Sequence, residues 1–171
     1  MANEKSFSNF KIHSQFSICE GAIKIDELAD YCKLNKIKSV GICDSYNLCG
    51  VLEFAEKISK SNTQPIIGSQ INFVHEKTLG RIPIFAKNEI GYKNLTKLSS
   101  KSYLEIDAIS SPHCKIKDLF EHKDGLIITS GNQFDFFGKL FKLNKIKIIE
   151  NIIKSFKENF NDKFYLEIQR H

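Results

Sequence analysis

The residues best suited to chemistry lie near the start of the chain, in Phe10-Lys11-Ile12-His13-Ser14 and the Glu20-Gly21 pair that follows. A short apolar segment ends at His13, a serine-containing turn comes next, and Glu20 supplies a carboxylate. Imidazole and carboxylate groups are common ligands of divalent metal ions. A working metal centre would favour a second histidine where Lys11 stands. The segment therefore has the form of a metal-binding motif whose first ligand is replaced.

Other polar residues follow the predicted strands at their carboxyl ends. They are Asp44, Gln70, the Ser130-Gly131-Asn132 segment and His171. In β/α barrels the carboxyl ends of the strands form the rim that holds the active site. The alternative is that polar residues simply begin wherever a strand ends, and the pattern alone leaves both interpretations open.

Alternating strand and helix patterns must position these residues. Ile25, Leu28, Ala29 and Cys32, for example, recur at helical spacing. Strands are predicted at 9–13, 38–43, 65–74, 81–86, 125–129 and 164–169, and helices at 24–35, 48–59, 91–103, 115–121, 134–143 and 145–160. This order predicts an α/β protein with a largely parallel sheet or barrel. A parallel strand normally needs a following element to cover it, so we expect residues 1–171 to be one domain that lacks its C-terminal part.

The composition excludes several classes of protein. No apolar run reaches the roughly 18 residues of a spanning helix, and residues 1–9 are polar, so we expect a cytoplasmic protein without membrane contact. Five cysteines without C-x-x-C spacing argue against a disulfide framework or a structural zinc site, and most should be buried. The net charge of +5 comes almost entirely from lysine, since Arg81 and Arg170 are the only arginines. Direct reading of nucleic acid usually recruits arginine, so the charge indicates a solvated surface.

Two further groups have a structural and a functional interpretation. Ser14 and Ser17 show no readable arrangement with histidine and an acid for nucleophilic catalysis, so turn and capping roles are favoured. The phenylalanines Phe134, Phe136, Phe137 and Phe141 favour a helical core face or a partner-binding patch over a platform for stacking bases.

The sequence also resembles a known family. It is similar, from about Phe10 to His171, to the PHP (polymerase and histidinol phosphatase) domain at the N-terminus of bacterial DNA polymerase III alpha subunits. The segments that carry the resemblance are His13-Ser14-x-x-Ser17 with Gly21, Ile42–Gly50, Pro65-Ile66-Ile67-Gly68, Ala86–Leu95, Gly125-Leu126-Ile127 with Ser130-Gly131, and Phe164-Tyr165-Leu166-Glu167. The Lys87–Leu95 segment is the most specific and indicates the polymerase branch rather than the free-standing phosphatases.

The resemblance implies a PHP-type distorted (β/α)7 barrel, of which this chain would form the larger part. The closing strands and the polymerase domains would lie beyond residue 171. Active members of the family hold a trinuclear metal cluster at the carboxyl rim of the barrel, built from His, Asp, Glu and sometimes Cys.

The resemblance implies that this chain keeps some of the metal ligands of the family and has lost others. His13 and His171 match family histidines, Asp44 is retained, and Glu20 stands where the family has aspartate. Four positions are substituted: Lys11 and Ser45 replace histidines, Gln70 replaces a glutamate, and Asn132 replaces a cysteine or histidine. The resemblance therefore implies a vestigial rim, with no catalytic residue and no metal or other cofactor expected in this chain.

Lys11 is the most adverse of these substitutions. A unit positive charge at ~4 Å from a dication costs roughly 8 kcal/mol at an effective dielectric of about 20. Lys11 must therefore deprotonate, move away or take the place of the metal, and we expect its ammonium near Glu20 or Asp44.

The leading functional hypothesis is a scaffold for DNA replication that docks the proofreading exonuclease subunit and other subunits of the replicative holoenzyme. The parent enzyme would contact DNA and catalyse template-directed synthesis with Mg²⁺, using carboxylates outside this chain. One alternative is an active metal-dependent phosphoesterase or 3′–5′ exonuclease that uses His13, Glu20, Asp44 and His171 with zinc or manganese. The other is a stand-alone, non-catalytic interaction module.

Overall fold

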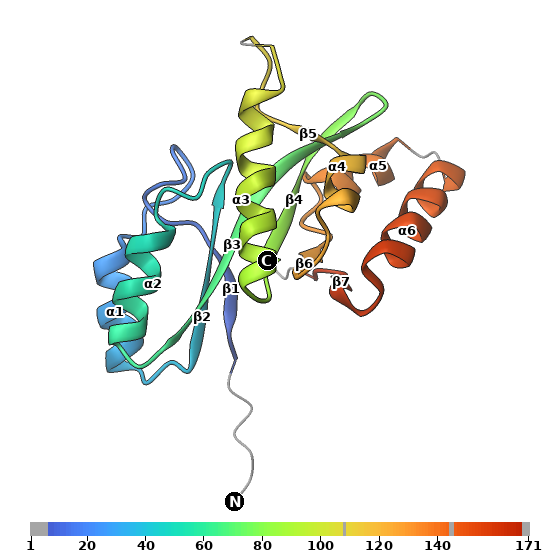
Figure 1. The fold of residues 1–171 in the computed structure, drawn as a ribbon. Helices are drawn as coiled ribbons and strands as arrows, with labels where there is room; N and C mark the ends of the chain where they lie inside the picture. Colours follow the sequence, from blue (N-terminus) through green and yellow to red (C-terminus); the bar gives the residue numbers. More distant parts are fainter. Residues whose placement is uncertain (1–6, 108, 144–145, 169–171) are drawn as a thin grey trace, which may run out of the picture.

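The computed structural model describes residues 7–107, 109–143 and 146–168 (Figure 1). The strands are β1 (Asn9–Ile12), β2 (Ser39–Ser45), β3 (Gln64–His75), β4 (Thr78–Ala86), β5 (Cys114–Lys115), β6 (Leu126–Thr129) and β7 (Phe164–Tyr165). The helices are α1 (Ile25–Leu34), α2 (Val51–Lys60), α3 (Glu89–Leu104), α4 (Ile116–Glu121), α5 (Phe136–Lys142) and α6 (Ile146–Phe160), followed by a 3₁₀ turn, η1 (Asn161–Lys163). Strands and helices alternate along the described chain, except that β3 leads directly to β4 and α5 to α6.

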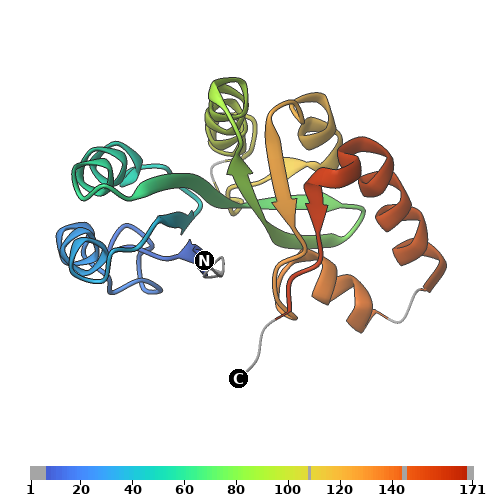
Figure 2. The same cartoon turned by 90° about the horizontal axis from the view of Figure 1, so that it is seen from below.

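The strands form one curved sheet in the order β1-β2-β3-β4-β6-β7, and β5 adds to β3. Figure 2 shows the helices on the outer side of this sheet, which stays open between the blue β1 and the red β7. Among the described strands, β1 and β7 each pair with a single neighbour. The predicted α/β class is thus confirmed, and the sheet is consistent with a barrel that is incomplete over these residues.

The prediction of a largely parallel sheet needs a correction at β4. This strand runs antiparallel to both of its neighbours, β3 and β6, whereas the other pairs are parallel. Its direction follows from the connection, because only Glu76 and Lys77 separate β3 from β4. Two residues can make a hairpin, but a parallel return would need a crossover of a dozen or more. The sequence signal for this reversal was that no helix is predicted between the strands at 65–74 and 81–86.

Several element boundaries also differ from the prediction. The last strand was expected at 164–169, but β7 is only Phe164–Tyr165, with Leu166–Ile168 outside any strand and Gln169 outside the described residues. The short β5 was not predicted, because two residues carry no readable period. The helix predicted at 134–143 begins at Phe136, after the turn that holds Asp135.

The outer side of the sheet is apolar and forms two cores. Under α1 and α2 the sheet contributes Ile12, Val40 and Ile42. Under α3 to α6 lies a larger core that includes Phe73, Ile84 and Phe156. The alternation along each strand therefore sends apolar side chains outward to the helices and leaves the inner side for polar residues. Cys32, Cys43 and Cys114 are buried, as predicted for most cysteines, while Cys19 and Cys49 are exposed.

The segment Lys87–Leu95, the most specific in the sequence, has a structural role. Asn88 accepts a hydrogen bond from the Gly91 N–H at 2.9 Å and so caps α3. Gly91 lies against Gly125, whose φ is +72°, and a Cβ at Gly91 would come 1.9 Å from the Gly125 carbonyl oxygen. Glycine is required at both positions, because this contact docks α3 against the start of β6.

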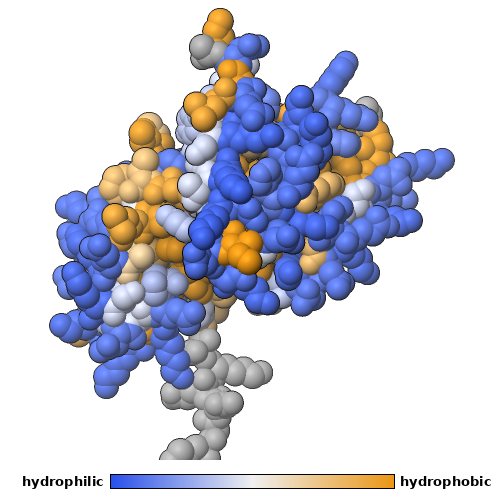
Figure 3. All heavy atoms as spheres, viewed as in Figure 1, coloured by the Kyte–Doolittle hydropathy of each residue, from blue (hydrophilic) through white to orange (hydrophobic). Residues whose placement is uncertain are grey.

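The face of the molecule seen in Figure 3 is mostly hydrophilic, and one of its apolar areas lies over the start of α2 and the neighbouring loop of residues 14–22. Ile18 and Leu52, which lie on these segments, are 84% and 72% exposed. None of the described helices has the length and apolar character needed to cross a membrane.

Candidate functional site

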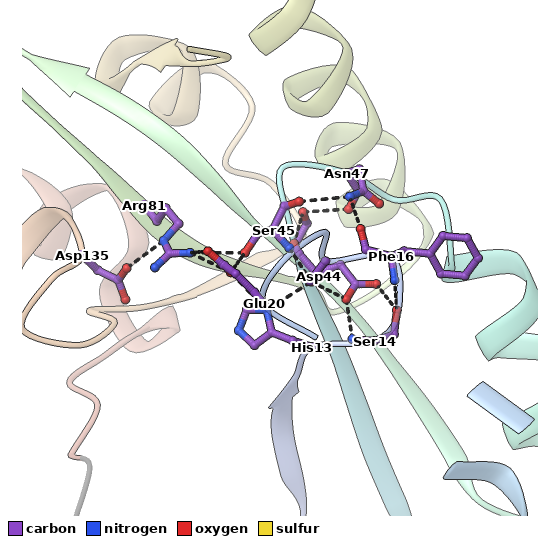
Figure 4. A network of polar contacts seen from close by, with 11 residues as sticks. His13, Ser14, Phe16, Glu20, Asp44, Ser45, Asn47, Arg81 and Asp135 are labelled. Atoms are coloured by element: carbon purple, nitrogen blue, oxygen red, sulfur yellow. Dashed lines mark hydrogen bonds and ion pairs between the residues drawn. The ribbon is translucent and has the colours of Figure 1, made fainter. Parts of the chain in front are cut away.

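A polar network lies at the carboxyl ends of β1 and β2 (Figure 4). At its centre lies Asp44, the last but one residue of β2, which is 2% exposed. It accepts three hydrogen bonds from the loop that follows β1. The Ser14 N–H and the Ser17 hydroxyl donate to Oδ1 at 2.6 and 2.7 Å, and the Ser14 hydroxyl donates to Oδ2 at 2.7 Å. The two serines thus fold the loop onto β2, in agreement with the turn role predicted for them, and they occupy both oxygens of Asp44.

Glu20, at the end of the same loop, binds an arginine. The Arg81 Nη1 donates to Glu20 Oε1 at 2.7 Å and to Oε2 at 2.9 Å. The Ser45 hydroxyl donates to Glu20 Oε2 at 2.6 Å. Burial tends to raise the pKa of Glu20, but the Ser45 hydrogen bond and the Arg81 guanidinium together hold that pKa below its ordinary value.

The same arginine reaches a second carboxylate on the other side. The Arg81 Nε donates at 3.2 Å to Oδ1 of Asp135, whose side chain is fully buried. The other oxygen of Asp135 accepts the Asn132 N–H at 2.8 Å. Asn132 itself uses its amide oxygen to accept the Phe134 N–H, so the predicted rim residue serves the turn before α5.

Lys11 does not lie where we expected it. Its Nζ donates to Glu167 Oε1 at 2.5 Å, rather than approaching Glu20 or Asp44. Glu167 follows β7, and its Oε2 accepts the Thr129 hydroxyl at 3.0 Å. Because the sheet curves, the inward side chain of β1 meets the segment after β7, a contact between residues 156 positions apart. The predicted partners of Lys11, Glu20 or Asp44, were therefore wrong. A carboxylate of the rim, that of Glu167, nevertheless neutralises the charge of Lys11.

Gln70, the residue that stands for a family glutamate, is 2% exposed in β3. Its Oε1 atom is buried and has no hydrogen-bond partner among the described residues. Gln70 is in register with Ser45 on β2 and with Pro83 on β4, so its side chain lies on the same side of the sheet as theirs. A buried acceptor without a donor is unusual and normally has a functional or evolutionary explanation.

His13 lies beside Glu20 at the edge of this network. Its Nδ1 is 3.2 Å from the Ser17 hydroxyl and 3.9 Å from Glu20 Oε2. Burial lowers the pKa of His13 below 6.5, and Glu20 only partly opposes this effect. The imidazole is therefore neutral at neutral pH.

These shifts predict a loss of stability in mild acid. Below pH 6.5 the unfolded chain protonates His13 before the folded chain does, so the free energy of unfolding falls with pH. Glu20 stabilises the fold above 4.5, and this contribution disappears as the pH falls through its lower folded pKa. Thermal unfolding against pH should show both steps, and His13→Gln should remove the first. An unchanged profile in that variant would contradict this role of His13.

The structure brings together six of the eight predicted rim residues in or beside this network: Lys11, His13, Glu20, Asp44, Ser45 and Gln70. Asn132 is joined to it only through Asp135, and His171 lies outside the described residues. Sequence reasoning missed Arg81 and Asp135. The available signal was that Arg81 is one of only two arginines in a lysine-rich chain and occupies a strand.

The donors that remain do not fit a family-type metal cluster. The carboxylate of Asp44 accepts hydrogen bonds from serines, and that of Glu20 accepts them from Arg81 and Ser45. The positive charges of Lys11 and Arg81 also lie on the rim, where they would repel a metal ion. In the described part of the chain, no group of three or more His, Cys, Asp or Glu side chains is arranged to hold a metal ion.

Comparison with known proteins now identifies the fold family. The profile of the PHP domain matches residues 9–171. The chain belongs to the PHP domain family. It is 33% identical over its whole length to the N-terminal region of the DNA polymerase III subunit alpha of Borreliella burgdorferi. It is 32% identical over 99% of its length to that of Haemophilus influenzae. The chain spans only 16% and 15% of the length of these relatives.

A solved structure supports the fold of this PHP domain. The structure is that of a Bifidobacterium adolescentis protein for which metal-dependent phosphoesterase activity has been suggested. The TM-score is 0.50 at 12% identity, over 71% of this chain and 65% of the other. At that identity the similarity concerns the fold alone.

Proposed function

We propose that this PHP domain is the N-terminal scaffold region of a replicative DNA polymerase, and that it docks the proofreading exonuclease subunit. The observation that carries the proposal is the match over the whole chain to DNA polymerase III alpha subunits at about one-third identity. In this proposal, template-directed synthesis with Mg²⁺ belongs to later domains of the parent enzyme, which also contact DNA. Strands from beyond residue 171 would complete the sheet at the edges of β1 and β7, and the protein would work in the cytoplasm.

The internal pairing of the rim supports a structural role over hydrolysis. A metal-dependent phosphoesterase needs carboxylates and imidazoles that are free to bind cations. Here Glu20 and Asp135 share Arg81, and Glu167 accepts from Lys11. The rim is thus organised to hold loops together, and we assign no catalytic residue to this chain.

Docking is tested with the full-length natural protein and the proofreading exonuclease subunit of the same organism. We expect the two to co-elute in size-exclusion chromatography, together with other subunits of the replicative holoenzyme where these are added. The first surface to examine is the apolar area over the start of α2 and the loop of residues 14–22, two segments that carry the exposed Leu52 and Ile18. Leu52→Asp should weaken the complex, whereas Leu104→Asp, at an 80% exposed leucine on α3, is the matched control. A full-length protein that does not bind the exonuclease subunit would contradict docking.

The alternative of an active phosphoesterase or 3′–5′ exonuclease has its own test. The full-length protein is incubated with single-stranded DNA and Mn²⁺ or Zn²⁺, beside a His13→Ala variant. We expect equal products from the two, because Glu20, the carboxylate beside His13, is bound to Arg81 and Ser45. Digestion that His13→Ala abolishes would support the hydrolase and overturn the scaffold assignment. Absence of a polymerase from the full reading frame would support a stand-alone module instead.

A further inference from the structure

Arg81 joins three segments of the rim that are distant in the sequence. It lies in β4, and its guanidinium contacts Glu20 of the loop after β1 and Asp135 of the turn before α5. Its Nη1 also donates to the Ser45 hydroxyl at the end of β2, at 3.3 Å. These partners are 61, 54 and 36 positions away from Arg81 along the chain. In Figure 4 the guanidinium lies between the two carboxylates.

The burial of these groups makes the cation necessary. Asp135 is fully buried, and the Arg81 side chain is only 22% exposed. A buried carboxylate is costly unless a positive charge or several hydrogen bonds compensate it. The planar guanidinium serves two carboxylates at once through separate N–H groups, as a bridging metal ion would do through its coordination positions.

Gln70, a buried acceptor, is a second and independent feature of this rim. Its buried Oε1 has no partner within the described part of the chain. Cross-strand register places Gln70 beside Pro83 on β4, two residues from Arg81 and on the same side of the sheet. The acceptor thus belongs to the same inner surface as the guanidinium, yet none of the donors of Arg81 reaches it.

We infer that Arg81 replaces a metal ion as the cation of this rim, and that it is Arg81 which keeps divalent metals out. Lys11, which the sequence predicted to be the obstacle to metal binding, instead binds Glu167, a different carboxylate from the two that Arg81 binds. Removal of Arg81 leaves Glu20 and Asp135 without their shared counter-charge, with the His13 imidazole 3.9 Å from Glu20. With Arg81 between them, these side chains do not form a metal-holding group in the described structure. Two carboxylates and an imidazole are nevertheless ligand types that suit Mn²⁺ or Zn²⁺, and without Arg81 they are free to close on an ion. Asp135 is not among the positions that the family resemblance matches to metal ligands, so the site opened in this way is a new one.

The test is metal uptake by the full-length natural protein and its Arg81→Gln variant. Equilibrium dialysis against Mn²⁺ or Zn²⁺, followed by elemental analysis, compares the two proteins. We expect about one additional ion per chain in Arg81→Gln. In chelator its first thermal transition should fall by roughly 5 °C, and the metal should restore at least half of that fall. Equal uptake by the two proteins would overturn the inference.

Three further variants separate this mechanism from others. Arg81→Lys keeps the positive charge and should take up no additional metal. Arg81→Gln combined with Glu20→Gln or Asp135→Asn should lose the additional ion, because one of its carboxylates is gone. Persistence of the additional ion in both combinations would contradict the assigned site.

A variant that cannot fold also gives an answer. If Arg81→Gln is insoluble without metal, expression with Mn²⁺ should recover it, as should the neutral triple variant Arg81→Gln, Glu20→Gln, Asp135→Asn. Failure of both would show that Arg81 acts other than as a counter-charge. The inference concerns the rim alone, so it is independent of whether the exonuclease subunit docks.

Discussion

Asp44→Ala should be among the most destabilising single substitutions in this protein, at about 3 kcal/mol of unfolding free energy. Asp44 accepts from the Ser14 N–H, the Ser14 hydroxyl and the Ser17 hydroxyl, and all three donors are buried. Alanine leaves them without an acceptor in a site that excludes water, and each unpaired buried donor costs roughly 1–3 kcal/mol. For a domain of this size the corresponding fall in Tm is roughly 6–12 °C.

A measurement of which segment loses protection in Asp44→Ala is more specific than the total loss of stability. Hydrogen exchange of a peptide that covers residues 14–22 should accelerate in Asp44→Ala, because the loop loses its attachment to β2. Asp30→Ala, at an exposed position of α1, is the matched control and should change stability by less than about 0.5 kcal/mol. Unchanged exchange in residues 14–22 would mean that the serines do not depend on Asp44.

Phe156→Ala is the second large effect, at about 4 kcal/mol. Phe156 is fully buried in α6, and its ring lies 5.0 to 6.5 Å from five other phenylalanine rings. These rings come from Phe120, Phe136, Phe137, Phe160 and Phe164. Truncation leaves a cavity at the point where α4, α5, α6 and β7 meet, and such a cavity collapses only in part.

Chemical denaturation followed by circular dichroism measures this loss. Phe141→Ala is the control, because Phe141 lies on α5 but is 58% exposed, and it should cost less than about 0.5 kcal/mol. Similar losses in the two variants would contradict the assignment of the aromatic cluster to the core. The predicted core role thus holds for Phe136 and Phe137, whereas Phe134 and Phe141 are exposed.

The periodic parts of the fold were predictable from the sequence. Residues at helical spacing, such as Leu28 and Cys32, are buried on α1. The gathering of polar residues at strand ends was also predictable, because Asp44 contacts Ser14 and Ser45 contacts Glu20 beside the carboxyl ends of β1 and β2. Local patterns suffice here, since each depends on which side of one element is buried.

The partners within the rim were not predictable in the same way. Lys11 binds Glu167, and Arg81 binds Glu20 and Asp135, through contacts that depend on the curvature of the whole sheet. Sequence spacing carries no information on distances across a curved sheet. The antiparallel direction of β4 makes the contacts of Arg81 harder still to predict. Arg81 reaches the carboxyl ends of the parallel strands from a strand that runs in the opposite direction to them.

Lys11 and Arg81 bind the rim carboxylates of this PHP domain, and we propose that they hold the rim without a metal. The most direct measurement is the metal content of the full-length natural protein after purification without chelator, together with the response of its first thermal transition to EDTA. We predict no zinc, iron or manganese bound in stoichiometric amount at the rim and an unchanged transition. Three tightly held ions per chain, lost with EDTA along with thermal stability, would contradict the account.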